Sequence, residues 1–348
     1  MILTLNLWSS SIKYSLFSTQ LKKIWSWYLE NITNHETALK TLFSWLPKEQ
    51  LNKLSVIGHR VVHGWEMFTK PTKITPQVLK KLKTLNDLAP LHNPVNIKWI
   101  EICQKLFPKI TNIAVFDTAF HQSMKPENFL YAIPKKYYQK YKIRRYGFHG
   151  TSHQYLREKY KKDFAPKNQK SHTIITCHLG NWASLALIRN GKVIETSMGF
   201  TPLEWVIMGT RCGSIDPAII TFLAQKESLS PSEISDILNK KSWLLAISEK
   251  TNDMKTLIEK YKSDSKSKLA IDMFVNSIIK YIGAYTALAN GIDAVIFSWW
   301  IGERWLLICQ KITKNLTFLA KTKFLVIPTD EEFQIAKTCK NFNKKTAR

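Results

Sequence analysis

Two short sequences lie close together near the middle of the chain: Val115-Phe-Asp-Thr-Ala-Phe-His121 and Arg144-Arg-Tyr-Gly-Phe-His-Gly-Thr-Ser-His153. They contain an Asp, two Arg and three His among aromatic and small residues. Such a mixture can hold an anion, orient it and donate hydrogen bonds to charge that develops during group transfer. A solvated basic loop followed by a capped helix is the alternative, but Phe120 and Tyr146 would be poor choices for a plain surface.

Hydrophobic patterning around these sequences divides the chain into two strand-rich halves. Because each half has a polar loop after its first strand, the pattern predicts an α/β protein in which a βββαβαβα unit is duplicated, with a cleft between the copies. Asn190-Gly191 predicts a tight hairpin turn in the second half. Thr75-Pro76 predicts a helix start, and Thr151 or Ser152 is expected to cap a second helix. The expected strands are residues 2–7, 14–18, 51–62, 112–116, 172–177, 184–189, 192–196 and 294–298, and the expected helices are residues 75–88, 151–162, 270–288 and a C-terminal segment from about 331.

Composition narrows the class of protein. The chain has 348 residues, which is enough for two domains with substantial cores. Its five cysteines form no CxxC pair, so neither a disulfide framework nor a zinc site is indicated. No apolar run reaches the length of a membrane span, and the start lacks the pattern of a signal peptide, so we expect a cytoplasmic protein without a membrane partner. The formal charge of +25 could attract nucleic acid, but the lysines are spread along the chain and no nucleic-acid module is recognisable.

Further motifs in the same order carry a resemblance to a known family. They include Asn6-Leu-Trp-Ser-Ser-Ser-Ile-Lys13, Gly58-His-Arg-Val-Val-His-Gly-Trp-Glu66, Thr176-Cys-His-Leu-Gly-Asn-Trp-Ala-Ser184, Met208-Gly-Thr-Arg211 and Ile327-Pro-Thr-Asp-Glu-Glu332. With these motifs the chain resembles the acetate kinase family, in the superfamily that also holds sugar kinases, heat-shock chaperone ATPases and actin. The resemblance implies two duplicated ribonuclease H-like, actin-like ATPase domains. The first would span residues 1–147 with the C-terminal helix at about 331–348, and the second, nucleotide-binding domain would span residues 148–330.

The resemblance also implies an activity and its partners. The family transfers the γ-phosphoryl group of ATP to acetate, giving acetyl phosphate and ADP, with Mg²⁺ (or Mn²⁺) as the metal and a homodimer as the assembly. Propionate or another short-chain acid is the alternative acceptor, because a pocket discriminates one methylene only weakly. A carboxylate nucleophile is already anionic, so the enzyme needs no general base and must instead offset repulsion between two anions.

The resemblance assigns roles to individual residues. Arg60 and Arg211 would flank the transferring phosphoryl group, His149 would donate a hydrogen bond to it, and Asp117 would position an arginine and the substrate. A small pocket for the acyl group would use Val62, Leu91, Phe148 and Pro202 together with Arg60. Asn6 and Glu331 would lie on the metal side. The nucleotide side would comprise Lys13, His178, Asn181, Trp182, Asp253, Lys255, Trp300 and Arg304.

Plainer interpretations of several of these residues stay open. Asp117 could cap a helix, and Lys13 could be a charge on a strand edge. His149 and His153 have the i, i+4 spacing of a metal pair, although the intervening glycine and helix start do not favour zinc. Lys255 replaces a family arginine and so loses the bidentate fork, and Arg304 replaces a family asparagine.

Tryptophan stands at family glycine positions, which is the chain's main anomaly. Glycine allows positive φ and a close approach of the backbone to phosphate, and tryptophan is the worst substitute for it. We interpret these residues as UGA codons translated as Trp, from an organism that reads UGA as Gly. The alternative is a catalytically dead, nucleotide-binding homologue. These glycine-position tryptophans are Trp8, Trp65, Trp182, Trp205, Trp243 and Trp300. Trp299 and Trp305 also fall where glycine is common.

Overall fold

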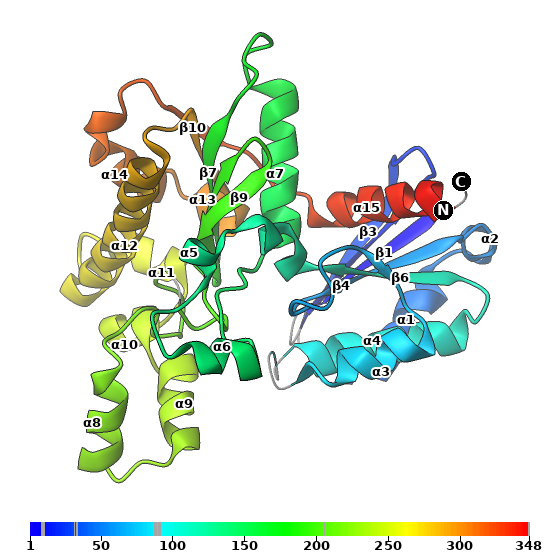
Figure 1. The fold of residues 1–348 in the computed structure, drawn as a ribbon, viewed down its shortest axis with the longest axis horizontal. Coiled ribbons are helices and arrows are strands. Elements are labelled where there is room, and N and C mark those ends of the chain that lie inside the picture. Colours follow the sequence, from blue (N-terminus) through cyan, green and yellow to red (C-terminus); the bar gives the residue numbers. More distant parts are fainter. Residues whose placement is uncertain are drawn as a thin grey trace. The chain divides into compact units, whose positions relative to one another are not determined.

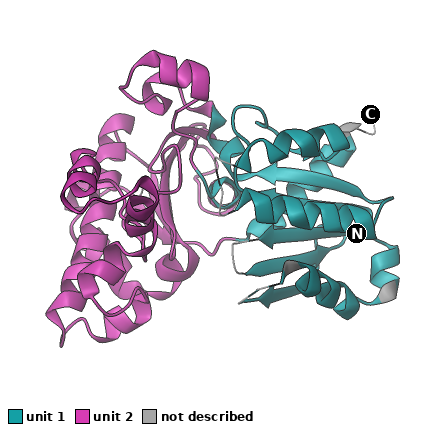
Figure 2. Ribbon diagram, turned by 90° about the horizontal axis from the view of Figure 1, so that it is seen from below, with its two compact units in different colours: residues 1–122, 148–155, 330–348 teal, residues 123–147, 156–329 magenta. Residues whose placement is uncertain are grey.

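The computed structural model describes residues 1–7, 11–30, 32, 34–86, 89, 92–204 and 206–346. The chain forms two compact units, coloured separately in Figure 2. Unit 1 comprises residues 1–122, 148–155 and 330–348, and unit 2 comprises residues 123–147 and 156–329. Residues 123–147 therefore group with the second unit. The expected boundary between two domains, after residue 147, stays a prediction.

Unit 1 is built on a six-stranded mixed sheet in the order β3-β2-β1-β4-β6-β5. The first three strands are antiparallel neighbours, whereas β1, β4 and β6 are parallel, so their carboxyl ends meet at one edge. The expected hairpin and both expected buried strands of this half are confirmed. The strands are β1 (Ile2–Leu7), β2 (Ile12–Phe17), β3 (Lys23–Leu29), β4 (Val56–Val61), β5 (Thr72–Lys73) and β6 (Thr111–Phe116).

Helices cover both faces of this sheet, with α15 on one face and α3 and α4 on the other (Figure 1). The α15 residues Ile335, Ala336 and Cys339 pack on the sheet residues Ile2 and Val56. The C-terminal helix thus returns to the first half of the chain, as predicted. The helices are α1 (His35–Trp45), α2 (Lys48–Asn52), α3 (Pro76–Lys83), α4 (Asn93–Leu106), the 3₁₀ helix η2 (Asp117–Ser123) and α15 (Glu331–Thr346), while α7 (Gly150–Asp163) has residues in both units.

Unit 2 repeats this sheet topology. Its five strands have the order β11-β10-β7-β8-β9, in which β7, β8 and β9 are antiparallel and β7, β10 and β11 are parallel. The predicted duplication and the α/β class are therefore confirmed. Asn190 and Gly191 both have positive φ, as a tight turn between β8 and β9 requires. The strands are β7 (Thr173–Leu179), β8 (Ala183–Arg189), β9 (Lys192–Thr196), β10 (Ala294–Ser298) and β11 (Lys323–Val326).

The long α12 packs on β7 and β8 and is the expected helix before β10, whereas α8 and α9 lie against each other away from the sheet (Figure 1). No helix in the described part of the chain is long and apolar enough to cross a bilayer. The helices that lie wholly in unit 2 are α5 (Pro126–Phe129), α6 (Lys135–Tyr141), α8 (Ala218–Lys226), α9 (Pro231–Lys240), α10 (Trp243–Ser248), α11 (Met254–Glu259), α12 (Ser265–Ala289), α13 (Trp299–Arg304), α14 (Leu306–Lys314) and the 3₁₀ helix η3 (Thr317–Leu319).

Two predicted helix boundaries are wrong. The helix α7 begins at Gly150, so Thr151 and Ser152 lie inside its first turn and do not cap it. Thr75 does cap α3, with Pro76 in the first turn, but that helix ends at Lys83 and not near residue 88.

Candidate active site

The centre of unit 1 holds a fully buried ion pair between Arg60 and Asp117. Arg60 lies near the end of β4, and Asp117 directly follows β6, so parallel pairing brings them to the same sheet edge. Arg60 donates to Asp117 Oδ2 from Nε at 3.0 Å and from Nη2 at 2.5 Å, and its Nη1 donates to the Leu7 carbonyl at 3.1 Å. These three hydrogen bonds to two acceptors fix the orientation of the guanidinium. The Asp117 carboxylate thus holds the Arg60 guanidinium, and in the described part of the chain it accepts no hydrogen bond from a backbone amide at a helix start.

A strained turn places Phe148 and His149 beside this pair. His149 has a left-handed φ of 54°, and a Cβ on Gly150 would lie 2.0 Å from the Asp117 carbonyl oxygen, so only glycine fits there. The Thr151 hydroxyl donates to Asp117 Oδ1 at 3.2 Å. Both carboxylate oxygens of Asp117 are thus engaged, and the start of α7 is fixed against the end of β6.

His121 supports the same turn from η2. Its Nε2 lies 2.8 Å from the Phe148 carbonyl oxygen, and its ring meets the His153 ring edge-on at a centroid distance of 5.7 Å. Burial lowers the pKa of His121 to about 4. A neutral imidazole therefore donates to Phe148, which makes His121 a structural support for the residues that precede α7.

Two buried carboxylates share one amide at the start of α15. Asn6 Nδ2 donates to Glu331 Oε2 at 2.8 Å and to Glu332 Oε1 at 2.9 Å. Lys13 Nζ lies 2.9 Å from Glu332 Oε2. Burial raises the pKa of the Glu331 carboxyl above its usual range, and the nearby Arg60 opposes that shift. The cluster ties the β1–β2 hairpin to α15 and concentrates oxygen atoms at one place.

The residues predicted to form the acyl pocket are only partly assembled in unit 1. Val62 and Phe148 are both almost completely buried there, and the Phe148 ring meets the His63 ring edge-on at 5.5 Å. Pro202 belongs to unit 2, where its carbonyl accepts from Arg211 Nη1 at 3.3 Å. Leu91 lies outside the described residues.

The turn between β7 and β8 in unit 2 holds the predicted phosphate loop, with Asn181 and Trp182. The guanidinium of Arg211 stacks on the Trp182 ring, 4.0 Å from its centroid. Arg211 is largely buried, and this burial lowers its pKa to about 10. Arg211 and Pro202 are therefore brought together with the loop that carries Trp182.

The other predicted nucleotide residues lie in three places within unit 2. The His178 ring stacks on Trp299 at 4.8 Å, at the adjacent ends of β7 and β10. Arg304 lies over the Trp300 ring, 4.0 Å from its centroid, within α13. Asp253 caps α11 by accepting from the Thr256 amide at 3.0 Å, which is a structural role, and the nearby Lys255 is exposed.

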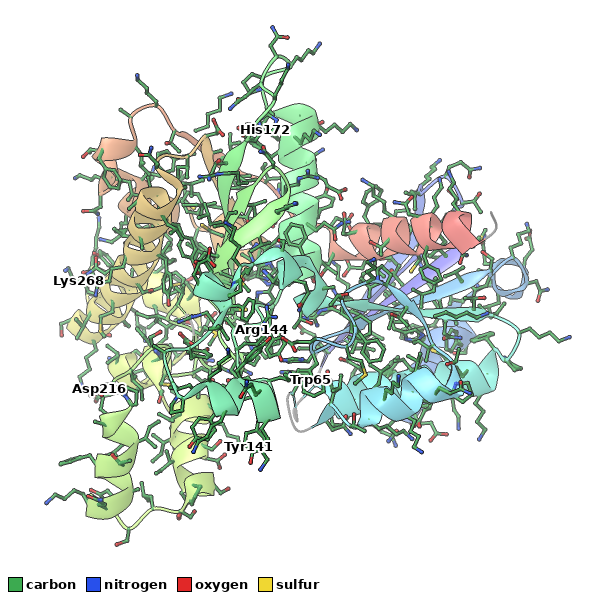
Figure 3. All side chains as sticks on the ribbon, viewed as in Figure 1. Trp65, Tyr141, Arg144, His172, Asp216 and Lys268 are labelled. Carbon is green, nitrogen blue, oxygen red and sulfur yellow. The ribbon has the colours of Figure 1, made fainter. Side chains whose placement is uncertain are left out.

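Three tryptophans adopt backbone conformations that favour glycine. Trp65, Trp243 and Trp299 have φ values of 55°, 65° and 68°, and Figure 3 shows where Trp65 lies in unit 1. A bulky residue in this region is strained. The Trp299 ring also comes within 2.3 Å of where a Cβ on Gly180 would be. Because tryptophan is a poor substitute for glycine, we expect a strained backbone at the glycine-position tryptophans, and a positive φ confirms this at Trp65 and Trp243. Trp182 and Trp300 do not have a positive φ, and Trp8 and Trp205 lie outside the described residues.

Sequence reasoning missed Glu332 as a member of the site. Its partners lie at the opposite end of the chain, so no local pattern indicates the contact. The only signal was its place beside Glu331 in the first turn of a helix. The contribution of Thr151 was also missed, because hydroxyl residues before a helix read as caps.

Two sheets that share one order over five strands, with helices packed on them, have the actin-like ATPase fold, and the family of this chain makes it a phosphotransferase. The chain belongs to the acetokinase family, whose model matches residues 25–323. It is 41% identical to the acetate kinase of Carboxydothermus hydrogenoformans over an alignment of 389 positions, which covers 97% of each chain.

Two solved structures are also similar. The acetate kinase of Porphyromonas gingivalis matches with a TM-score of 0.87 at 34% identity, over 97% of this chain and 98% of that one. A propionate kinase from Francisella tularensis matches with a TM-score of 0.89 at 36% identity, over the same shares. These similarities extend over both units, so the family assignment applies to nearly the whole chain.

Proposed function

We propose that this protein reversibly transfers the γ-phosphoryl group of ATP to acetate, giving acetyl phosphate and ADP. The single observation that carries the proposal is the buried Arg60–Asp117 pair, because three hydrogen bonds hold its guanidinium in one orientation. A preorganised cation offsets repulsion between two anions without reorganising during the reaction. We take acetate as the acceptor because the similar proteins from C. hydrogenoformans and P. gingivalis are named acetate kinases.

The roles proposed for individual residues follow from their surroundings. Arg60 would neutralise charge on the transferring group, and His149, held in a left-handed conformation beside Asp117, would donate a hydrogen bond to that group. Arg211 would add a second positive charge from unit 2. Val62 and Phe148 would exclude water from the acyl group. No general base is needed, because the acetate oxygen attacks as an anion.

Asn6 and Glu331 fit a hard divalent cation. Asn6 Oδ1 and Glu331 Oε1 are buried and accept no hydrogen bond from the described residues, so both oxygens are available as ligands. Oxygen donors of this kind suit Mg²⁺ or Mn²⁺. The bound metal would neutralise charge on the phosphate oxygens of ATP. Lys13 is proposed to contact phosphate from the β1–β2 hairpin, where Glu332 holds it.

Steady-state kinetics test the acceptor. We expect a higher kcat/KM for acetate than for propionate, and the reverse order would move the assignment to the propionate kinase activity named for the F. tularensis protein. The experiment uses the glycine form, defined as the chain in which the six glycine-position tryptophans and Trp299 are replaced by Gly.

A second candidate function applies to the chain as written. Its strained tryptophans favour a catalytically dead homologue.

A homodimer is also proposed. The helix α8 has no buried residue, and it exposes the large apolar side chains of Ile219, Ile220 and Phe222. An apolar face of this kind fits burial against a second copy. Sedimentation equilibrium should give a dimer, and Phe222→Asp should shift it toward monomer. A monomeric parent chain would exclude this assembly.

Two further expectations stay predictions: that the protein is cytoplasmic, and that it has no role in binding nucleic acid.

A further inference from the structure

A pocket of about 330 Å³ lies in unit 2, where α7 ends and β7 begins. Figure 3 labels His172 at this end of the molecule. Four cationic side chains line the pocket and no carboxylate does. The four are Arg157, Lys161, Lys167 and Lys170. Like charges gathered around a hollow repel one another, and an anion relieves that repulsion.

None of these four cations forms an ion pair or a side-chain hydrogen bond with any residue that the structure describes. Two acidic residues near this end of unit 2 have other partners. Asp293, close enough to influence Tyr160 of the pocket, accepts from Gln169 Nε2 at 2.7 Å and from the Thr173 amide at 2.6 Å. Asp163 pairs with Lys159 at 2.7 Å. The donors to Asp293 are neutral amides, so its carboxylate keeps its charge and offsets part of the positive charge, but among the described residues it forms no ion pair with any of the four pocket cations.

The pocket wall is built by specific contacts. His172 and Asn190 exchange two hydrogen bonds, from the His172 amide to Asn190 Oδ1 at 2.9 Å and from the Asn190 amide to the His172 carbonyl at 2.8 Å. The Arg157 guanidinium lies against Gly191, where a Cβ would come within 2.1 Å of Nη2. His172 Nδ1 is buried and has no hydrogen-bond partner among the described residues. The two hydrogen bonds hold the His172 and Asn190 wall together, and the Arg157 guanidinium lies against that wall at Gly191.

The helix dipole explains only part of this charge. Cations in the last turn of a helix offset its negative end, which accounts for Lys161. Arg157 lies earlier in α7, and Lys167 and Lys170 lie in the loop after it, so the dipole does not require them. Arginine presents a fork that matches oxyanions in a bidentate manner, and lysines add mobile point charges.

We propose that this pocket binds a small phosphorylated compound that carries at least two negative charges. The volume is near the lower limit for small-molecule sites, which suits a compact anion and not a polymer. This site is separate from the residues assigned to phosphoryl transfer, and the proposal does not depend on the kinase activity.

Lysine footprinting tests the site locally, so that anions bound elsewhere do not interfere. The full chain is treated with an acetylating reagent, with and without pyrophosphate, and modification of each lysine is measured by mass spectrometry. At pyrophosphate concentrations ten times Kd, the acetylation rates of Lys161, Lys167 and Lys170 should fall about tenfold. Lys262, which is exposed and outside the pocket, should react at an unchanged rate.

Variants test which side chains of the pocket bind pyrophosphate. Arg157→Gln should abolish protection of Lys167 and Lys170, whereas the charge-matched control Lys262→Gln should retain it. If Arg157→Gln does not fold, Lys167→Gln with Lys170→Gln in the exposed loop should abolish protection of Lys161. Absence of protection in the parent chain, equal protection of Lys262, or protection by citrate but not by pyrophosphate would overturn the proposal.

Discussion

Trp299 offers a direct measurement of backbone strain. We predict that Trp299→Gly is more stable than Trp299→Ala. Both changes remove the same ring and the same stacking on His178, so their difference isolates the cost of a Cβ at a φ of 68°. A left-handed conformation costs an L-residue about 1–2 kcal/mol, while the greater unfolded-state freedom of glycine costs about 0.5–1 kcal/mol. The net advantage of glycine should be about 1 kcal/mol.

Urea unfolding followed by far-ultraviolet circular dichroism measures this difference in the free energy of unfolding. Trp305 is the matched control, because it is also a tryptophan next to α13 but has a φ of −106°. There the order should reverse, with Trp305→Ala more stable than Trp305→Gly by about 0.5–1 kcal/mol. An alanine variant at least as stable as the glycine variant at position 299, or the same glycine preference at position 305, would refute the reasoning.

The other predictions concern the gene, the arginines and the response to acid. The source gene should carry UGA at the six glycine-position tryptophans, and UGG at most of them would end that interpretation. In the glycine form, Arg60→Ala and Arg211→Ala should lower kcat and kcat/KM together, because the charge acts mainly in the transition state; a raised KM for ATP alone would contradict the assigned roles. Burial lowers the pKa values of His59 and His121 to about 4, so the unfolded state binds more protons between about pH 4 and 6.5. The contribution of these histidines to stability should therefore fall as the pH drops through this window, by up to about 3 kcal/mol per histidine. Burial raises the pKa values of Glu331 and Glu195 to about 7, which acts in the opposite direction, so the parent is compared with a His59→Gln, His121→Gln double variant that keeps both carboxyls. Urea unfolding should show the parent losing stability relative to the double variant as the pH drops, and equal slopes in the two proteins would be inconsistent with this prediction.

The strand framework was predictable because its signals are local. The turn at Asn190-Gly191 needs residues that tolerate positive φ, and both have it. The order of motifs also identified Arg60 and Asp117, and the structure joins them in one ion pair. In both cases the residue type itself indicates the structural role, which is a positive φ in the turn and a charge in the ion pair.

Long-range contacts decided the features that sequence patterns missed. The sequence predicts Thr151 as a helix cap, but it lies in the first turn of α7 and its hydroxyl donates to Asp117. Glu332 reads as one more acidic residue at a helix start, yet its partner Asn6 lies on β1. Such roles follow from packing across the unit, and no local pattern encodes them.

Formation of acetyl phosphate by the glycine form tests the central claim most directly. The purified protein is incubated with ATP, Mg²⁺ and acetate, and acetyl phosphate is trapped as its hydroxamate. The account predicts steady product formation by the glycine form, almost none when Arg60→Ala is added to it, and little from the chain as written. A glycine form that folds and binds ATP but makes no acetyl phosphate would contradict the account.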